Sequence, residues 1–316
     1  MADSTLLDRQ LVFVTGKGGA GKSTVTAALS LLAARGGKRV LVCEVHAAQE
    51  RIGPLLGGEA GNGVMREVRP GIHALDVRPG EAMREYGLLV LRFRAVTHAV
   101  FENRVVRYFL RVIPSLAELV VLGKILHEAR FRRPDGRPRW DLVLVDAPAT
   151  GHAVQLLRVP SALLDAVPAG PLRRDAEWME RLLLDPVRTA VALVTLPEEM
   201  PVNEAVELDA QVRGVLGMAR AGLFVNAMPG SRVSLEEARA LSPASGSPPP
   251  LGPAARAAEL SSLRAEEAKR HLTRVRAALD LPVTVVPLFP SADWGPLEVE
   301  KVADAIESAW RLRRAG

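Results

Sequence analysis

Short apolar runs recur along the chain, and the stretches between them carry apolar residues at helical spacing. Most of these runs are rich in β-branched residues and apolar throughout, which is typical of strands buried on both faces of a parallel sheet. The pattern therefore predicts an α/β fold with a doubly wound, mostly parallel sheet. The predicted strands are residues 11–15, 40–45, 72–77, 142–146, 190–196, 222–226 and 283–287.

Two segments depart from this alternation. Residues 80–139 lack convincing strands and carry Leu, Val and Arg at three- and four-residue spacing, so we predict a helical insertion subdomain there. Residues 241–253 are rich in Pro, Ser and Gly, which favours an exposed loop before helices at 254–280 and 297–313. We otherwise expect a single domain over residues 1–316.

The first predicted strand passes into glycines and ends in the pattern G-x-x-x-x-G-K-S/T, with Gly16, Gly21, Lys22 and Ser23 at the fixed positions. Backbone N–H groups of such a loop cradle phosphates, and the next helix directs its positive end to the same anion. The motif assigns Lys22 to the β/γ-phosphates and Ser23 to Mg²⁺. A tight strand–helix turn with an incidental lysine is the alternative. The expected nucleotide-binding residues here are Gly16, Lys17, Gly18, Gly19, Ala20, Gly21, Lys22, Ser23 and Thr24.

A second lysine, Lys17, lies inside the same loop, although an ordinary P-loop needs no cation there. The chain has six lysines, and two of them fall in this loop. The sequence G-K-G-G-A-G-K-S resembles the deviant P-loop ATPases. In that group the early lysine reaches a partner's nucleotide, so the resemblance implies an ATP-dependent dimer. A solvated surface lysine is the alternative.

The predicted strand at 142–146 ends in Asp146, where a Walker-B-type aspartate lies close to Mg²⁺. The following A-P-A-T-G-H resembles the switch II segment of the arsenite-pump and tail-anchored-protein-targeting ATPases, the ArsA-type family. That resemblance implies P-loop NTPase architecture and a turn at Thr150 and Gly151 that senses the γ-phosphate. A simple helix N-cap at Thr150 is compatible with it.

Later segments extend the resemblance along the chain. The strand end Phe-Val-Asn at 224–226 is similar to the family segment whose asparagine reads adenine, which implies that role for Asn226. The next residue is Ala227, where the family often has Gln. The segment V-P-L-F-P at 286–290 resembles the loop that flanks the base, which implies base contacts for Pro287 and Leu288.

Switch I departs from the family pattern D-P-A-H-N. Glu44 replaces the aspartate that positions the attacking water, and the sequence around it is similar to that of the bacterial paired ArsA-like ATPases. In those proteins two paralogues form a complex. The chain has one cysteine, Cys43, so neither the family's C-x-x-C zinc motif nor its arsenite-binding cysteine cluster can form. We therefore expect neither zinc nor arsenite.

Net charge is +5, yet residues 84–139 alone carry twelve Lys and Arg against five Asp and Glu. Such a patch attracts nucleic acid, anionic lipid or acidic proteins. Aromatic residues make up 4% of the chain and form no stacking array, so a solvated helical face is favoured over nucleic-acid binding. A single cysteine and the absence of an apparent signal peptide or membrane-length apolar run favour the cytoplasm.

Together these features predict a Mg²⁺-dependent ATPase that acts as a dimeric switch. We expect Lys17, Lys22, Glu44 and Asp146 to carry hydrolysis, Ser23 and Asp146 to hold the metal, and the insertion to bind a partner or client. The dimer is a homodimer or a heterodimer with an ArsA-like paralogue. A catalytically weak ATP-binding regulatory subunit is the first alternative. A partition-type ATPase is the second, and the T-G-H sequence of switch II argues against it.

Overall fold

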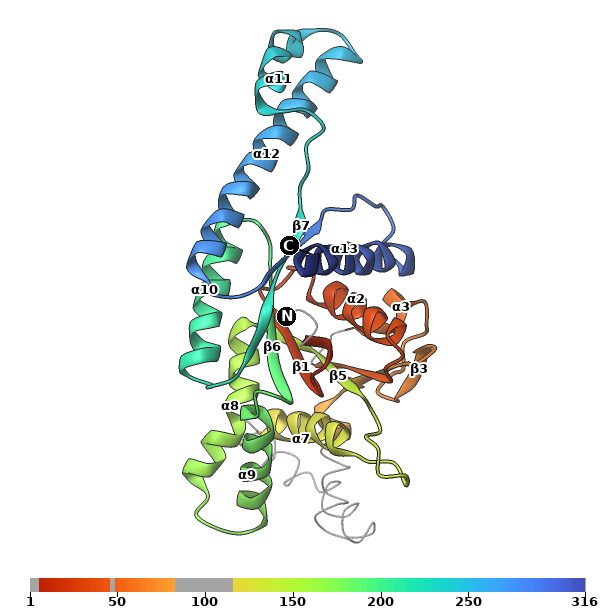
Figure 1. The fold of residues 1–316 in the computed structure, drawn as a ribbon, viewed down its shortest axis with the longest axis vertical. Coiled ribbons are helices and arrows are strands. Elements are labelled where there is room, and N and C mark those ends of the chain that lie inside the picture. Colours follow the sequence, from red (N-terminus) through yellow and green to blue (C-terminus); the bar gives the residue numbers. More distant parts are fainter. Residues whose placement is uncertain (1–5, 46–48, 83–115, 316) are drawn as a thin grey trace.

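The computed structural model describes residues 6–45, 49–82 and 116–315, which contain an eight-stranded sheet flanked by helices (Figure 1). The strand order is β3-β4-β2-β5-β1-β6-β7-β8, and every neighbouring pair is parallel except β3 and β4. The predicted α/β class with a mostly parallel sheet is therefore confirmed. The strands are Leu11–Gly16 (β1), Val40–Val45 (β2), Arg66–Arg69 (β3), Ile72–Val77 (β4), Leu142–Ala149 (β5), Thr189–Thr195 (β6), Arg220–Met228 (β7) and Val283–Pro287 (β8).

The edge strand β3 is the one strand that the hydrophobic pattern does not predict. Its sequence is Arg-Glu-Val-Arg, and its residues are exposed or half-buried. An edge strand pairs on one side only, so it needs no continuous apolar run. It adds an antiparallel edge to an otherwise parallel sheet.

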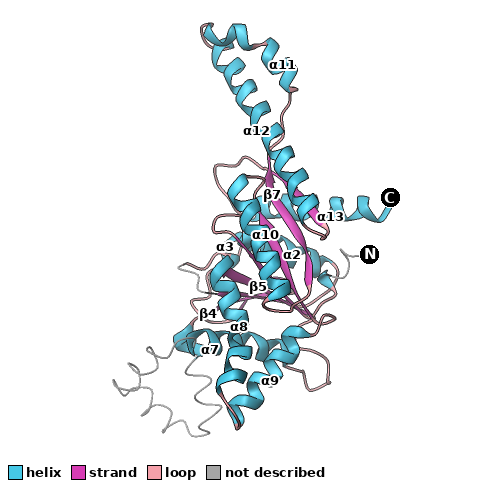
Figure 2. Ribbon diagram, turned by 90° about the vertical axis from the view of Figure 1, so that its left-hand side faces the viewer, coloured by secondary structure: helices cyan, strands magenta, loops and turns pink. Residues whose placement is uncertain are grey.

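Helices cover both faces of the sheet, and successive residues of β1 contribute to opposite cores. Leu11 and Phe13 lie in the core beneath α7, α8, α9 and α10, whereas Val12 and Val14 lie in the core beneath α2, α3 and α13. The turned view of Figure 2 looks onto α8, α10 and α12 on the first of these faces. The helices are Lys22–Arg35 (α2), Ile52–Leu56 (α3), Leu116–Arg130 (α7), Thr150–Ala166 (α8), Pro171–Leu184 (α9), Glu199–Gly214 (α10) and Pro296–Ala315 (α13).

Helix α7 comes from the segment predicted as a helical insertion. Its buried residues Leu122, Ile125 and Leu126 pack in the first core, where α7 contacts β4, β5 and α8. The described C-terminal part of that segment therefore belongs to the layer that covers the sheet. Residues 83–115 of the predicted insertion lie outside the described residues, and its boundaries stay a prediction.

A helical arm, formed by α11 (Leu235–Ala240), the 3₁₀ helix η1 (Ser242–Gly246) and the first turns of α12 (Leu251–Ala278), projects beyond the sheet (Figures 1 and 2). The loop predicted at 241–253 is therefore wrong for η1 and for the start of α12. Pro253 fits the first turn of α12 because an N–H there has no intrahelical partner.

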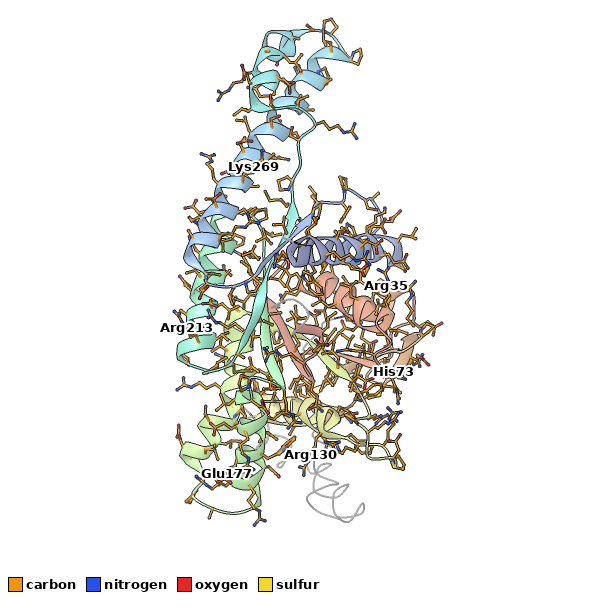
Figure 3. All side chains as sticks on the ribbon, viewed as in Figure 1. Arg35, His73, Arg130, Glu177, Arg213 and Lys269 are labelled. Atoms are coloured by element: carbon orange, nitrogen blue, oxygen red, sulfur yellow. The ribbon has the colours of Figure 1, made fainter. Side chains whose placement is uncertain are left out.

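Charged side chains follow the outer surfaces of the long helices, as Arg213 on α10 and Lys269 on α12 show (Figure 3). Among the helices of the described segments, none combines the length and apolar character that crossing a bilayer requires.

Candidate active site

The loop between β1 and α2 brings the predicted phosphate-binding residues to the carboxyl edge of the sheet. Gly19 and Gly21 have φ angles of 81° and 85°, which favour glycine, and Gly21 is the N-cap of α2. A Cβ on Gly16 would lie 1.9 Å from the carbonyl oxygen of Val194. The glycines are therefore required by backbone conformation and by close approach to β6, in addition to any role toward phosphate.

Lys22 opens α2 and directs its ammonium group back over the loop. Its Nζ donates a hydrogen bond of 3.2 Å to the carbonyl oxygen of Lys17. Burial lowers the pKa of Lys22, the Asp146 carboxylate partly opposes that effect, and Arg51 adds to it. The ammonium group therefore lies against the phosphate loop, and its contact with phosphate stays a prediction.

Ser23 and Asp146 are directly hydrogen-bonded, which joins the first turn of α2 to β5. The Ser23 hydroxyl donates to Asp146 Oδ2 at 2.6 Å. Burial raises the pKa of Asp146, although Ser23, Lys22 and Arg51 each lower it. The sequence predicted both residues as metal ligands, and the structure brings them together.

The second oxygen of Asp146 gives a test of the Mg²⁺ assignment. Oδ1 is buried and has no hydrogen-bond partner in the described part of the chain. A buried carboxylate oxygen without a donor is costly, whereas a hard divalent cation or its bound water satisfies it. The residues present therefore fit Mg²⁺, with one hydroxyl and one carboxylate as the protein's ligands.

Glu44 lies at the end of β2, opposite Asp146 on β5 and Asp76 on β4. It is 2% exposed. Its Oε1 accepts the N–H of Arg51 at 2.7 Å and its Oε2 accepts the N–H of Ile52 at 3.2 Å, so the carboxylate caps the start of α3. The predicted contact of Glu44 with the attacking water stays a prediction, and residues 46–48 of switch I lie outside the described residues.

The pKa of Glu44 is raised to about 7. Burial is the main cause, and the carboxylates of Asp146 and Asp76 add to it, while the two backbone hydrogen bonds act in the opposite direction. A carboxyl group with a pKa near neutrality is suited to general acid–base chemistry, but structural networks also produce such shifts.

Arg51 belongs to the electrostatic environment of this site, although no sequence motif includes it. Its positive charge adds to the lowering of the Lys22 pKa and opposes the rise of the Asp146 pKa. The only available signal was a cation seven residues after Glu44, which is too common to indicate a function by itself.

Asn226, predicted to read the base, lies against the phosphate loop. Its Nδ2 donates to the carbonyl oxygen of Ala20 at 2.9 Å, and a Cβ on Gly21 would lie 2.1 Å from the same Nδ2. The N–H of Leu288 donates to the carbonyl oxygen of Met228 at 2.9 Å. The loop that starts with Pro287 and Leu288 is thereby held to the strand end that carries Asn226.

Switch II begins at the end of β5. Thr15 Oγ1 at the end of β1 donates to the carbonyl oxygen of Pro148 at 3.0 Å, which joins this segment to the phosphate loop. Helix α8 begins at Thr150, and its N-cap is Ala149, without a side-chain capping bond. The N-cap interpretation of Thr150 is therefore wrong by one residue, and γ-phosphate sensing by Thr150 and Gly151 stays a prediction.

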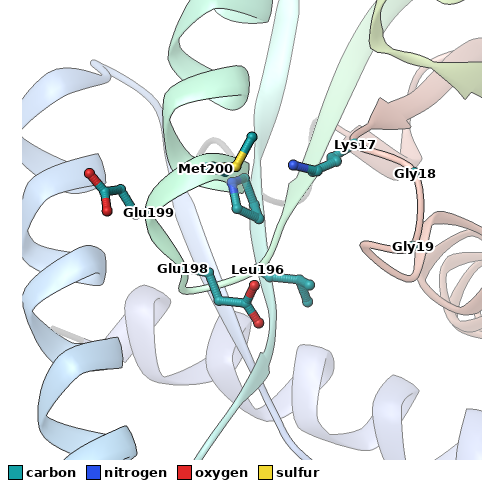
Figure 4. A pocket seen from close by; sticks show the side chains of 8 residues that line it. Lys17, Gly18, Gly19, Leu196, Glu198, Glu199 and Met200 are labelled. Atoms are coloured by element: carbon teal, nitrogen blue, oxygen red, sulfur yellow. The ribbon is translucent and has the colours of Figure 1, made fainter.

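Lys17 extends from the loop in a different direction from Lys22. Its Nζ lies 2.8 Å from Oε1 of Glu204 on α10. Lys17, Gly18 and Gly19 line one side of an open cleft of about 470 Å³, and the other side is formed by the start of α10 (Figure 4). The remaining lining residues are Leu196, Glu198, Glu199, Met200 and Pro201. The sequence analysis missed Glu204.

Comparison with known proteins finds ATPases as relatives of this chain, in agreement with the resemblance that its motifs show. The chain is 33% identical over 210 residues to the ATPase BagA of Mycobacterium tuberculosis, a match that covers 65% of this chain and 61% of that protein. It is 25% identical over 238 residues to an arsenical pump-driving ATPase of Acidiphilium multivorum and over 232 residues to one of Escherichia coli. These two matches each cover 68% of this chain and 39% of the relative.

The family comparison covers the segment that contains most of the site. The sequence pattern of the anion-transporting ATPases matches residues 9–168, which include the phosphate loop, Glu44, Asp146 and switch II. This match extends over half of the 316 residues. The chain therefore belongs to the ArsA-type anion-transporting ATPase family.

Proposed function

We propose that this protein binds ATP together with Mg²⁺ at the loop between β1 and α2 and hydrolyses it. The main support for this proposal is the 2.6 Å hydrogen bond from Ser23 to Asp146 Oδ2. The other oxygen of the same carboxylate, Oδ1, is buried and has no hydrogen-bond partner within the described residues. Lys22 lies close enough to Asp146 for their charges to interact. The binding of a nucleoside triphosphate with its metal requires a hydroxyl, a carboxylate and a lysine at the end of a parallel sheet, and all three are present here.

Different residues bind the phosphates, hold the metal and orient the attacking water. Lys22 and the backbone N–H groups of residues 16–21 hold the phosphates and stabilise charge that develops on them. Ser23 and Asp146 hold Mg²⁺, which when bound neutralises charge on the phosphate oxygens. Glu44, at the end of the neighbouring strand, orients the water for in-line attack on the γ-phosphate.

We further propose that ATP closes a dimer, because the side chain of Lys17, unlike that of Lys22, is directed out of its own phosphate loop, to Glu204 on α10. Its side chain faces the open cleft beside α10. The partner is a second copy of this chain or an ArsA-like paralogue. A client or partner protein would bind at residues 80–139, and the site of action would be the cytoplasm.

The proposal is tested by calorimetric titration with ATP, with and without Mg²⁺, and by phosphate release at steady state. Sedimentation velocity with a non-hydrolysable ATP analogue measures dimer formation, and we expect Lys17→Ala to bind the analogue as a monomer but to dimerise less. Lys301→Ala, an exposed lysine on α13, is the control for loss of a positive charge. Absence of ATP binding would overturn the proposal.

A second function is favoured by the contacts of Glu44. Both of its carboxylate oxygens already accept backbone N–H groups of α3, so the residue has a structural role independent of water. The protein would then be an ATP-binding regulatory subunit that leaves hydrolysis to a paralogue. Single-turnover hydrolysis by the isolated protein separates the two functions, because a regulatory subunit binds ATP without releasing phosphate.

We do not propose that this protein acts on arsenicals, although two of the relatives are named arsenical pump-driving ATPases. The family's arsenite-binding cysteine cluster and its C-x-x-C zinc motif each need more than one thiolate, and this chain has only Cys43. Burial raises the pKa of the Cys43 thiol, and its side chain is fully buried in β2. We expect neither arsenite nor zinc to change its ATP affinity.

A further inference from the structure

The ammonium group of Lys17 is held within its own chain by Glu204. The Nζ–Oε1 distance is 2.8 Å, and the two side chains are 29% and 30% exposed. Glu204 lies in the second turn of α10, and α10 is fixed to the sheet by buried Val202, Ala205 and Leu208. The carboxylate is therefore presented from a rigid element to a residue of a glycine-rich loop.

The surroundings of Lys17 leave the ion pair as the main constraint on its side chain. A Cβ on Gly18 or Gly19 would meet no atom within 4 Å, so the two residues that follow Lys17 lie in open space. Glu199 also lines the cleft, but Figure 4 shows its carboxylate directed away from Lys17, towards α12. Within the described segments, Glu204 is the acidic residue paired with Lys17.

We propose that Glu204 is the positioning residue of Lys17: it holds the ammonium group against α10 in the separate protomer, and ATP-dependent dimer closure has to break this ion pair. The inference rests on the proposed dimer, in which the same ammonium group neutralises phosphate charge of the partner's nucleotide. Lys17 cannot serve both anions at once. Glu204 therefore opposes closure until nucleotide phosphate competes for the lysine.

The size of this effect follows from the exposure of the pair. An ion pair as accessible to solvent as this one contributes little to stability, and a two-fold dimer breaks two of them. Neutralising Glu204 is therefore expected to lower the dimer dissociation constant by about 2- to 30-fold. The difference between variant and wild type should shrink at high salt, because salt screens exposed charges.

The first experiment measures dimerisation of Glu204→Gln by sedimentation velocity, with Mg²⁺ and a non-hydrolysable ATP analogue, over a range of protein concentrations. Glu207→Gln is the matched control, since Glu207 is an exposed acid on the same helix. We expect a lower dissociation constant for Glu204→Gln alone. An unchanged constant, or a weaker dimer, would overturn the proposal, and a weaker dimer would place Glu204 in the interface itself.

The second experiment needs no dimer and separates this inference from the proposed function. Without nucleotide, the rate at which an amine-acylating reagent labels Lys17 is measured by peptide mass spectrometry. We expect labelling at least about twofold faster in Glu204→Gln than in wild type and Glu207→Gln, because the paired ammonium is less available. Equal labelling would overturn the ion pair in solution. Failure of wild type to dimerise with the analogue would overturn the dimer, whatever the labelling result.

Discussion

The Ser23 hydroxyl donates a 2.6 Å hydrogen bond to Asp146 Oδ2, although the two residues are 123 positions apart. The contact forms because β1 and β5 are adjacent parallel strands, with Val14 opposite Asp146. The carboxyl ends of both strands therefore meet at one edge, where α2 begins. The metal assignment depends on this contact and on the unpaired Oδ1 of Asp146.

Asp146→Asn should weaken the binding of Mg²⁺ at the nucleotide site. An amide keeps an oxygen that can accept from Ser23 but loses the negative charge that attracts the cation, so we expect the Mg²⁺ concentration for half-maximal turnover to rise at least about tenfold. A magnesium titration of phosphate release measures it. Asp165→Asn, an exposed acid on α8, is the control and should match wild type. Equal magnesium curves for all three proteins would remove Asp146 from the metal site.

Lys22→Ala should abolish measurable ATP binding and leave the fold intact. Within the described residues, the side chain of Lys22 donates its hydrogen bond to the carbonyl oxygen of Lys17, and alanine is a good helix former at the start of α2. We therefore expect the free energy of unfolding to change by less than about 1 kcal/mol. Calorimetric titration and denaturant unfolding measure the two quantities. ATP affinity equal to that of wild type would exclude Lys22 from the phosphate site.

The sequence predicts the sheet well because its central strands are buried on both faces. Seven of the eight strands appear as apolar runs, and their limits agree with the structure to within a few residues. The hydrophobic pattern does not predict strand β3 or helix η1, because these elements lack such burial. They lie at an edge and on the projecting arm, where solvent replaces packing and no hydrophobic period develops.

The residues of the candidate site also fall into two groups, those that the sequence predicts and those that it does not. Ser23, Lys22 and Asp146 were identified because each occupies a fixed place in a motif, and the fold then brings them together. Glu204 could not be found, because an acid in the second turn of a surface helix has no motif and gains its meaning only from the 2.8 Å contact with Lys17. Long-range pairs of exposed charges leave no pattern in a single sequence.

Glu44 should make stability depend on pH between about 4.3, the ordinary pKa of a glutamate, and about 7. Since the folded state raises this pKa, the folded protein holds the proton more tightly than the unfolded chain does. The contribution of Glu44 is therefore largest below pH 4.3 and is lost as pH rises to 7. Denaturant unfolding at pH 5 and pH 8 should show wild type losing about 1–3 kcal/mol more than Glu44→Gln.

Exposed Glu207 provides the control for that measurement. Glu207→Gln should keep the pH dependence of wild type, because its carboxyl group is open to solvent. Parallel pH dependences of wild type and Glu44→Gln would show that burial of Glu44 is relieved in solution.

Glu44→Gln should also lower the rate of hydrolysis at least about tenfold, equivalent to 1.4 kcal/mol in the barrier, with little change in ATP affinity. Each carboxylate oxygen has a second lone pair, so a water can bind Glu44 while the N–H groups of Arg51 and Ile52 remain bonded. Glutamine keeps the size and one accepting oxygen but not the charge. Steady-state phosphate release and calorimetric titration measure the two effects.

The matched control is Glu50→Gln, because the Glu50 carboxylate also accepts backbone N–H groups, but those of Gly61 and Gly63, which belong neither to the phosphate loop nor to α3. If both variants lose activity equally, the effect comes from the fold of the segment after β2 and not from water. If turnover of Glu44→Gln stays within twofold of wild type, Glu44 is only the cap of α3. If wild type binds ATP but releases no phosphate, the regulatory-subunit function is favoured and hydrolysis belongs to a partner.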